Sequence, residues 1–367
     1  MAVTLADVAA RAGVSSATVS RVLNGNYPVA GSTRERVQRA VADLDYVVNG
    51  QARALAAATS DLVGVLVNDV ADPFFGILAS AVQAEIAAGA GEPGGGKLAV
   101  VCNTGGSPEA ELTYLTLLER QRAAGVVLTG GSVENTEHAE AVTARLSRLA
   151  ASGTRIVLCG RPPVVLSSDV PAPMAVTFDN MGGARRLTEY LLSLGHRRIG
   201  YVAGPVERST TRHRMEGHRA ALAAARAATG GSGGSDGGDA EAERLTVHAN
   251  YDRSSGYDAA LELLRREPDL TAVVAANDTV ALGVCAALRE RGLSIPGDVS
   301  VAGFVDLPFS VDASPALTTV RIPLQEAGAR AGRLVMGRQS PPPGGVATVG
   351  TELMVRGSTA PPRPGAV

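Results

Sequence analysis

Apolar and polar residues follow two different patterns along this chain, and the pattern changes near residue 60. In residues 1–59 apolar side chains recur every three or four positions, which is the spacing of one face of an α-helix. From residue 60 to residue 360, short uninterrupted apolar runs alternate with helical segments. Strands that are buried on both faces of a parallel sheet produce such runs. The pattern therefore predicts a fold of class α plus α/β, with a small helical head before a large α/β body.

The body, residues 60–360, is too long for one comfortable domain, so we expect two doubly wound α/β subdomains. The N-terminal subdomain is expected at 60–161 and 323–339, and the C-terminal subdomain at 162–320 and 346–360. The apolar runs predict strands at 62–67, 98–102, 125–128, 156–159, 175–178, 199–203, 272–276 and 299–304.

Three short helices are predicted in the head, residues 1–46. Thr4, with an acid three residues later, has the pattern of a helix start, and Gly13 can adopt the left-handed backbone that ends this helix. A second helix follows this turn, and Ser32 with Glu35 predicts a capping box for a third. Two short helices joined by a tight glycine-containing turn form a helix-turn-helix.

The second helix of the head begins with short side chains, those of Ser15, Ser16, Ala17 and Thr18. A helix-turn-helix places the N-terminal residues of its second helix against base edges in the major groove of DNA. Small side chains allow the helix to approach, hydroxyl groups can bond phosphates or bases, and Arg21 can reach a guanine. This pattern favours DNA binding over the alternative, a helical hairpin that serves only for contacts with proteins.

Charge and composition narrow the classes of function. The chain has a net charge of −2, but the charge is unevenly distributed. Residues 1–58 carry six arginines and four acidic residues, so their net charge is +2, whereas the net charge of the remaining residues is −4. A positive head suits modest attraction to phosphates. The three cysteines are far apart and the five histidines lack the spacing of metal ligands. No apolar run reaches the ~18 residues of a membrane span, and the start lacks a secretory signal, so we expect a cytoplasmic protein without cofactor, metal or membrane partner.

Two dense segments of the head are "TLADVAARAGVSSATVSRVLNG" (4–25) and "RERVQRAVADLDYVVNGQARAL" (34–55). They resemble the DNA-binding head of the LacI/GalR family of transcription regulators. The resemblance implies that Ser16 and Ala17 are the pair that reads the bases at the start of the recognition helix.

The same resemblance implies a hinge helix in the linker, residues 47–59. In the family this helix inserts a leucine into the minor groove, and the matching residue here is Leu55. Val48 stands where the family usually has a proline, so we expect the hinge to depend more on DNA in order to fold. Pattern and resemblance together predict DNA contacts by Thr4, Ser15, Ser16, Ala17, Thr18, Arg21, Asn24, Tyr46, Asn49, Ala52 and Leu55.

Several segments of the body carry a second likeness, among them "DPFF" (72–75), "LGHRRIGYVAGP" (194–205), "RMEGHRAAL" (214–222), "ANDTVALG" (276–283) and "IPGDVSVAGF" (295–304). They resemble the effector-binding core of the same family, which is similar to type I periplasmic sugar-binding proteins. Sugar pockets combine an aromatic platform with polar groups that bond several hydroxyls. The candidates for effector binding are Asp72, Phe74, Phe75, Arg161, Arg214, Tyr251, Asn277 and Asp306.

Acids that the family commonly places in this pocket are absent. In "GFVD" Val305 stands directly after the aromatic residue, with Asp306 next, and at another frequent acid position Gly160 is followed by Arg161. The loss of two carboxylates beside Arg214 makes the pocket more positive, which favours an anionic or phosphorylated carbohydrate over a neutral one. The competing interpretation is that Asp306 replaces the missing acid and preserves binding of a neutral sugar.

The sequence is best interpreted as that of a ligand-controlled repressor that binds a pseudo-palindromic operator in double-stranded DNA as a homodimer. The resemblance implies carbohydrate uptake or catabolism as the regulated process. A solute-binding protein without DNA function is the alternative, and the helix-turn-helix argues against it. An enzyme on the same scaffold is a third interpretation, but the sequence offers no nucleophile–base pair or metal set.

Overall fold

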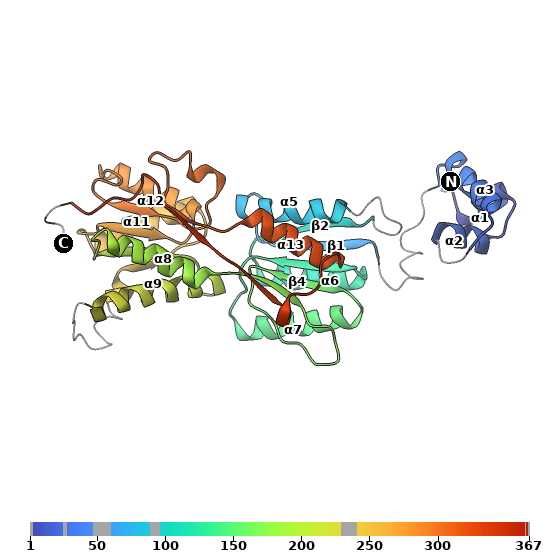
Figure 1. Cartoon of the computed structure of the whole chain (residues 1–367), viewed down its shortest axis with the longest axis horizontal. Coiled ribbons are helices and arrows are strands. Elements are labelled where there is room, and N and C mark those ends of the chain that lie inside the picture. Colours follow the sequence, from blue (N-terminus) through green and yellow to red (C-terminus); the bar gives the residue numbers. More distant parts are fainter. Residues whose placement is uncertain are drawn as a thin grey trace.

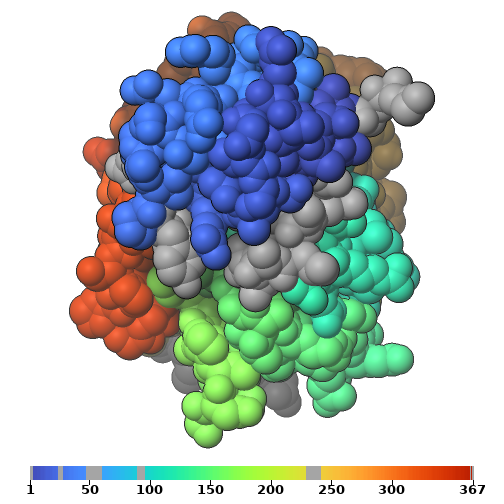
Figure 2. All heavy atoms as spheres, turned by 90° about the vertical axis from the view of Figure 1, so that its right-hand side faces the viewer, coloured from blue at the N-terminus to red at the C-terminus, as the bar shows by residue number. Residues whose placement is uncertain are grey.

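The computed structural model describes residues 3–24, 28–46, 60–88, 96–228, 241–363 and 365. Figure 1 shows a three-helix head, followed by a body of two α/β subdomains. Figure 2 shows the molecular surface from the end at which the head lies, with the head in blue.

The head is built from three helices, α1 (Leu5–Ala12), α2 (Ser16–Asn24) and α3 (Gly31–Asp43). The hydroxyl of Thr4 accepts a hydrogen bond from the backbone N–H of Asp7 (3.3 Å), and the Asp7 carboxylate accepts one from the N–H of Thr4 (2.8 Å). Gly13 follows α1 with a φ of 64°, the left-handed conformation that glycine adopts without strain. The buried core of the three-helix head consists of Val8, Ala9, Ala12, Val19, Val37 and Ala40. The predicted helix-turn-helix is therefore confirmed.

The capping box predicted for the third helix is wrong. α3 begins at Gly31, with Ala30 as its N-cap residue and no side-chain cap bond. Ser32 therefore lies inside the first turn, past the position at which a hydroxyl can accept a bond from the free N–H groups. The sequence spacing of Ser32 and Glu35 does not reveal this earlier start.

The N-terminal subdomain contains a six-stranded parallel sheet with the order β11-β5-β4-β3-β1-β2. Its strands are β1 (Leu62–Val67), β2 (Leu98–Asn103), β3 (Gly125–Thr129), β4 (Arg155–Cys159), β5 (Met174–Phe178) and β11 (Val346–Val349). Successive side chains of a strand point to opposite faces. Val127 and Val157 therefore pack with the helices α5 (Pro73–Ala87) and α13 (Leu324–Met336). Leu128 and Leu158 pack on the other face with α6 (Pro108–Arg120) and α7 (Thr136–Ala151).

The C-terminal subdomain contains a four-stranded parallel sheet with the order β7-β6-β8-β9. Its strands are β6 (Ile199–Ala203), β7 (Thr246–His248), β8 (Ala272–Ala275) and β9 (Ser300–Ala302). Helices α8 (Asn180–Ser193) and α9 (Ser209–Ala228) cover one face, and α11 (Arg253–Arg266) and α12 (Asp278–Glu290) cover the other. The predicted pair of doubly wound units is therefore confirmed. In the part of the chain that the structure describes, no helix is long and apolar enough to cross a membrane.

The predicted boundary between the subdomains differs from the observed one. Residues 162–320 and 346–360 are expected in the C-terminal subdomain, but β5 and β11 lie in the N-terminal sheet. β5 pairs with β4, where Val176 lies opposite Cys159, and β11 pairs with β5. An apolar run indicates that a strand is buried, but it does not indicate which of two sheets buries it. The chain consequently crosses between the subdomains after β5, before α13 and after β11, and the last two crossings pair as the antiparallel strands β10 (Thr319–Arg321) and β12 (Glu352–Met354).

Candidate DNA-binding face and effector cleft

The start of α2 forms the face of the head that is predicted to bind DNA. Ser15, Ser16 and Ala17 are exposed to solvent. Ser15 Oγ accepts a hydrogen bond from the backbone N–H of Thr18 (3.2 Å) and lies 2.9 Å from Thr18 Oγ1, so these two hydroxyl groups fix the first turn. Ser16 and Ala17 are thereby presented at the tip of the helix, and Arg21 is exposed one turn later. A recognition helix reads base edges with residues at these positions.

The remaining predicted DNA contacts are of two kinds. Thr4 caps α1 and Tyr46 is half-buried against the core of the head, so both have a structural role. Four contacts lie outside the described residues, namely the side chain of Asn24, and Asn49, Ala52 and Leu55. The hinge helix and its leucine wedge therefore remain predictions.

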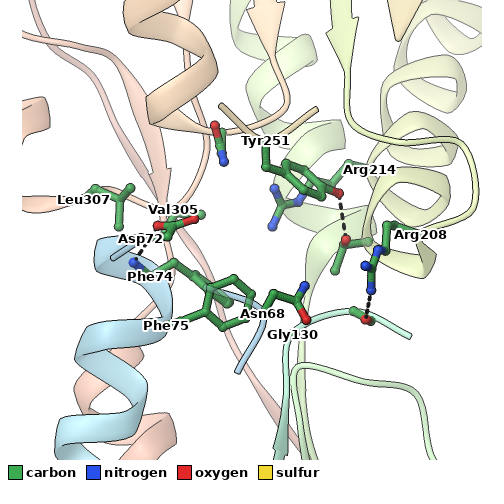
Figure 3. A pocket seen from close by; sticks show the side chains of 13 residues that line it. Asn68, Asp72, Phe74, Phe75, Gly130, Arg208, Arg214, Tyr251, Val305 and Leu307 are labelled. Atoms are coloured by element: carbon green, nitrogen blue, oxygen red, sulfur yellow. Dashed lines mark hydrogen bonds between the residues drawn. The ribbon is translucent and has the colours of Figure 1, made fainter. Parts of the chain in front are cut away.

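A cleft lies between the two subdomains (Figure 3). The cleft lies where strands of both sheets end, since Asn68 follows β1, Gly130 follows β3 and Asn277 follows β8. Ligands of open α/β sheets bind outside the carboxyl ends of the strands. The lining residues are Asn68, Asp72, Phe74, Phe75, Gly130, Gly131, Arg208, Thr210, Arg214, Tyr251, Asn277, Val305 and Leu307.

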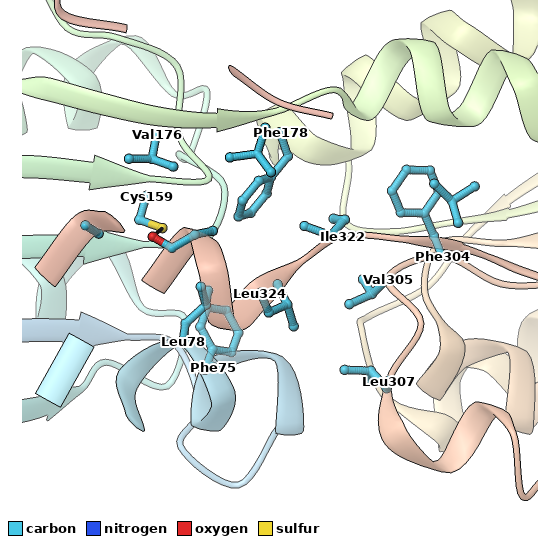
Figure 4. Packing of buried hydrophobic residues seen from close by; sticks show 14 of the residues in the cluster. Phe75, Leu78, Cys159, Val176, Phe178, Phe304, Val305, Leu307, Ile322 and Leu324 are labelled. Carbon is cyan, nitrogen blue, oxygen red and sulfur yellow. Dashed lines mark hydrogen bonds between the residues drawn. The ribbon is translucent and has the colours of Figure 1, made fainter. Parts of the chain in front are cut away.

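The aromatic side of the cleft is held by the start of α5. Asp72 caps this helix, because its Oδ1 accepts a hydrogen bond from the N–H of Phe74 (2.9 Å), and burial raises the pKa of its carboxyl. The rings of Phe74 and Phe75 meet edge to face with centroids 4.8 Å apart. Phe75 is 8% exposed and packs into the hydrophobic core beside Leu78 and Leu324 (Figure 4), whereas Phe74 is half-buried. Phe74 therefore offers the larger aromatic surface to a ligand.

Arg214 is fixed on the opposite side of the cleft. Its Nε donates to Asn180 Oδ1 (2.8 Å), its Nη1 donates to the carbonyl of Ala276 (2.5 Å), and its guanidinium carbon lies 4.0 Å from the centroid of the Phe304 ring. Among the described residues, Nη2 finds no hydrogen-bond partner. A rigid guanidinium with one free edge is suited to bonding an oxyanion or a pair of hydroxyls.

Tyr251 completes this wall with two threonines. Its hydroxyl lies 2.9 Å from Thr210 Oγ1 and 2.7 Å from Thr211 Oγ1. Asn277 caps α12, since its Oδ1 accepts a hydrogen bond from the N–H of Val280 (2.7 Å). The structure thus brings together six of the eight predicted effector residues: Asp72, Phe74, Phe75, Arg214, Tyr251 and Asn277.

Arg161 is not part of this cleft. Its Nη1 and Nη2 donate to the two carboxylate oxygens of Glu111 (2.9 and 2.5 Å), and Nη2 also approaches the carbonyl of Thr129 (3.3 Å). Its partner on α6 draws the side chain to the opposite side of the β3–α7 loop. The expectation that Arg161 adds positive charge to the pocket is therefore wrong.

Asp306 is not part of this cleft either. Its Oδ2 accepts a hydrogen bond from Arg321 Nε (2.8 Å), and its Oδ1 lies 2.6 Å from Arg356 Nη2. Val305 and Asp306 have φ angles of 110° and 64°, and of the two only Val305 lines the cleft. The interpretation that Asp306 replaces the missing acid is therefore not supported by this conformation.

Three polar residues that line the cleft are not among the predicted effector residues: Asn68, Arg208 and Thr210. Arg208 donates through Nη2 to the carbonyl of Gly106 (2.7 Å) and through Nη1 to that of Gly131 (3.3 Å). Asn68 follows the carboxyl end of β1, and Arg208 and Thr210 follow that of β6. Because ligands of α/β sheets bind at the carboxyl ends of strands, this position in the sequence could have identified all three as candidates.

A helix-turn-helix head and a body whose two subdomains line a common cleft define a DNA-binding transcriptional regulator. The family model described as bacterial regulatory proteins, lacI family, matches residues 4–49, and the model described as periplasmic binding protein-like domain matches residues 188–359. The chain belongs to the LacI family of bacterial regulatory proteins.

Relatives support this assignment along almost the whole chain. The HTH-type transcriptional regulator GalS of Salmonella typhimurium is 37% identical over 325 residues, which cover 88% of this chain and 86% of GalS. The structure of the transcriptional regulator CelR with cellobiose is 32% identical, with a TM-score of 0.64 and coverage of 97% of this chain and 99% of that one. The lac repressor dimer bound to operator and the anti-inducer ONPF is 27% identical, with a TM-score of 0.73 and coverage of 98% and 100%.

Proposed function

We propose that this regulator is a repressor that binds a pseudo-palindromic operator as a homodimer, and that a carbohydrate in the cleft controls its affinity for DNA. The cleft carries this proposal, because Asp72 and Phe74 from the N-terminal subdomain face Arg214 and Tyr251 from the C-terminal subdomain across one space (Figure 3). A ligand that bonds both walls favours a closed arrangement of the subdomains, and such closure can alter the spacing of two DNA-binding heads. CelR with cellobiose and the lac repressor dimer on its operator support the analogy.

The charge of the cleft favours an anionic or phosphorylated carbohydrate. Two guanidinium groups, those of Arg208 and Arg214, line the cleft with one carboxylate, that of Asp72. Neither arginine forms a salt bridge with a carboxylate of the described residues; Arg208 donates to the carbonyls of Gly106 and Gly131, and Arg214 to Asn180 and the carbonyl of Ala276. Val305 lines the same cleft, and its side chain offers no oxygen to a sugar hydroxyl. The second positive charge of the cleft, beside that of Arg214, is therefore proposed to come from Arg208 and not from Arg161.

Calorimetry with matched sugars tests this preference. Glucose and galactose are compared with their 6-phosphates on the full chain, and we expect the phosphorylated member of a pair to bind at least fivefold more tightly. Arg208→Met should remove most of that difference while leaving the affinity for the neutral sugar within about twofold. Tighter binding of the neutral sugar in every pair, unchanged by Arg208→Met, would contradict the anionic preference.

Binding to the DNA upstream of the protein's own gene tests the repressor function. Fluorescence anisotropy of a labelled duplex should show a stoichiometry of one dimer per site, and a ligand found by calorimetry should change the affinity. Light scattering on the free protein reports the proposed dimer directly. Because its target is DNA, we propose that the protein acts in the cytoplasm and has neither an enzymatic activity nor a membrane partner.

A further inference from the structure

The two subdomains also meet beside the effector cleft, at a place where no chain crossing joins them. There residues 131–134 of the β3–α7 loop lie against residues 207–212, which lead into α9. A Cβ atom at Gly131 would lie 2.9 Å from the hydroxyl oxygen of Thr210, so glycine permits the segments to approach this closely. We call these two segments, 131–134 and 207–212, the latch.

Backbone hydrogen bonds join the two segments of the latch. The N–H of Glu134 donates to the carbonyl of Glu207 (2.7 Å), and the N–H of Ser209 donates to the carbonyl of Ser132 (3.0 Å). Ser209 is the first residue of α9, so its N–H has no acceptor within the helix. The loop of the N-terminal subdomain supplies that acceptor. Opening of the latch would expose both N–H groups to water.

An ion pair joins the same two segments. Arg212 donates through Nη2 to Glu134 Oε1 (2.8 Å) and through Nε to Glu134 Oε2 (2.9 Å), which makes the pair bidentate. These bonds hold the pKa of the Glu134 carboxyl below its ordinary value, so the pair is ionised. Arg212 Nη1 also donates to Glu216 Oε1 (2.8 Å), four residues later on α9. Glu134 and Arg212 both lie outside the lining of the cleft.

Arg208 connects the latch to the cleft (Figure 3). Its backbone forms an antiparallel bridge with Val133, and its side chain lines the cleft. The guanidinium donates to the carbonyls of Gly106 and Gly131, two acceptors in the opposite subdomain (2.7 and 3.3 Å). A closed latch therefore holds this positive charge at the cleft, whereas an open latch withdraws both acceptors from it.

We propose that Glu134 and Arg212 are positioning residues for the effector: their ion pair holds the latch closed, and the closed latch presents Arg208 to an oxyanion of the ligand. This role rests on the proposed function of the cleft, in which Arg208 binds the anionic group. Closure of the latch and binding of such a ligand stabilise each other, because both favour the same arrangement of the subdomains. The side chains of Arg212 and Glu134 are 47% and 29% exposed, so the expected effects are modest.

Amide hydrogen exchange on the full chain tests the latch without any ligand. The N–H groups of Glu134 and Ser209 should be protected in the wild type, and their protection factors should fall about threefold in Arg212→Gln and in Glu134→Gln. The matched control is Glu216→Gln. It removes the other carboxylate partner of Arg212, which lies within α9, and should leave both protection factors within about 1.5-fold of the wild type.

Calorimetry with glucose 6-phosphate tests the positioning of Arg208. Arg212→Gln and Glu134→Gln should each bind this probe about threefold more weakly than the wild type, although neither residue lines the cleft. The double variant should lose no more affinity than either single variant, because all three lack the same ion pair. Glu216→Gln should bind the probe as the wild type does.

Unprotected N–H groups at Glu134 and Ser209 in the wild type would overturn the latch. Losses that add up in the double variant, or an equal loss in Glu216→Gln, would overturn the role of the pair. Unchanged affinity of both single variants, beside a wild type that binds the probe, would overturn the positioning of Arg208. If the wild type binds no sugar phosphate, the proposed ligand fails, whereas protection factors that fall in the two variants still support the latch. The exchange experiment therefore distinguishes failure of this inference from failure of the proposed function.

Discussion

The carboxyl group of Asp278 bonds Leu307, a residue of the cleft wall, and Thr319. The titration of this carboxyl group should make the body less stable as the pH rises. Asp278 is fully buried as the first residue of α12. Its Oδ1 accepts a hydrogen bond from Thr319 Oγ1 (2.5 Å) and its Oδ2 accepts one from the N–H of Leu307 (2.7 Å). Burial outweighs these bonds and raises the pKa of this carboxyl to about 6, from an ordinary value of 3.8. The folded state therefore holds a proton that the unfolded state has already released.

The size of the effect follows from these two pKa values. A group with a raised pKa contributes stability that is complete below the unfolded value and is lost as the pH rises through the folded value. A difference of about two pKa units corresponds to about 3 kcal/mol over the full range, of which about 1.4 kcal/mol is lost between pH 5 and pH 8.

Asp278→Asn removes this titration and should flatten the pH profile of stability. The free energy of unfolding, measured by urea titration with circular dichroism, should fall by about 1.4 kcal/mol more in the wild type than in the variant between pH 5 and pH 8. Asp312→Asn is the control, because Asp312 is an aspartate that is exposed to solvent. Parallel wild-type and Asp278→Asn profiles over this range would refute the assignment, and so would an equal change in the control.

Three further substitutions test the head and the body. Arg21→Ala should weaken operator binding by ~1–3 kcal/mol and relax sequence preference in fluorescence anisotropy; an equal loss on random duplex would reduce Arg21 to a phosphate contact. Thr4→Ala removes the cap of α1 and should lower the stability of the head by about 1 kcal/mol in thermal unfolding, a result that unchanged melting would contradict. Gly283→Ala places a Cβ 2.1 Å from the carbonyl oxygen of Arg253 and should destabilise the body by ~1–3 kcal/mol, whereas Gly350→Ala, with open space around it, should not.

Local sequence patterns predicted which segments form strands better than they predicted which strands pair with one another. The apolar run at 175–178 identified β5 correctly, but its membership of the N-terminal sheet depends on pairing with β4. β10 and β12 have the sequences TVR and ELM, which form no apolar run, and they become strands by pairing with each other where the chain crosses between subdomains. Such contacts join residues far apart in the sequence, and no short window contains both partners.

The cleft was predictable where a motif fixes both the backbone and the side chain. Asp72 caps a helix and thereby places Phe74, and both features are local. Arg161 was misplaced because its position is decided by Glu111, a residue fifty positions earlier on α6. A long flexible arginine follows its strongest partner, so its position in sequence does not define the site that it serves.

The backbone at Val305 explains why the cleft lacks the acid that the family commonly places there. A φ of 110° is rare for a β-branched residue and costs of order 1–3 kcal/mol. The surrounding structure imposes it, because the N–H of Val305 donates to the carbonyl of Val320 (2.7 Å) and the N–H of Ile322 donates to that of Val305 (3.0 Å). The side chain at this position therefore faces the cleft whichever residue stands there, and its neighbour Asp306 is held by Arg321 and Arg356. Moving the acid by one position in the sequence consequently removed it from the cleft, and Arg208 and Arg214 are left there with Asp72 as the only carboxylate among the described lining residues.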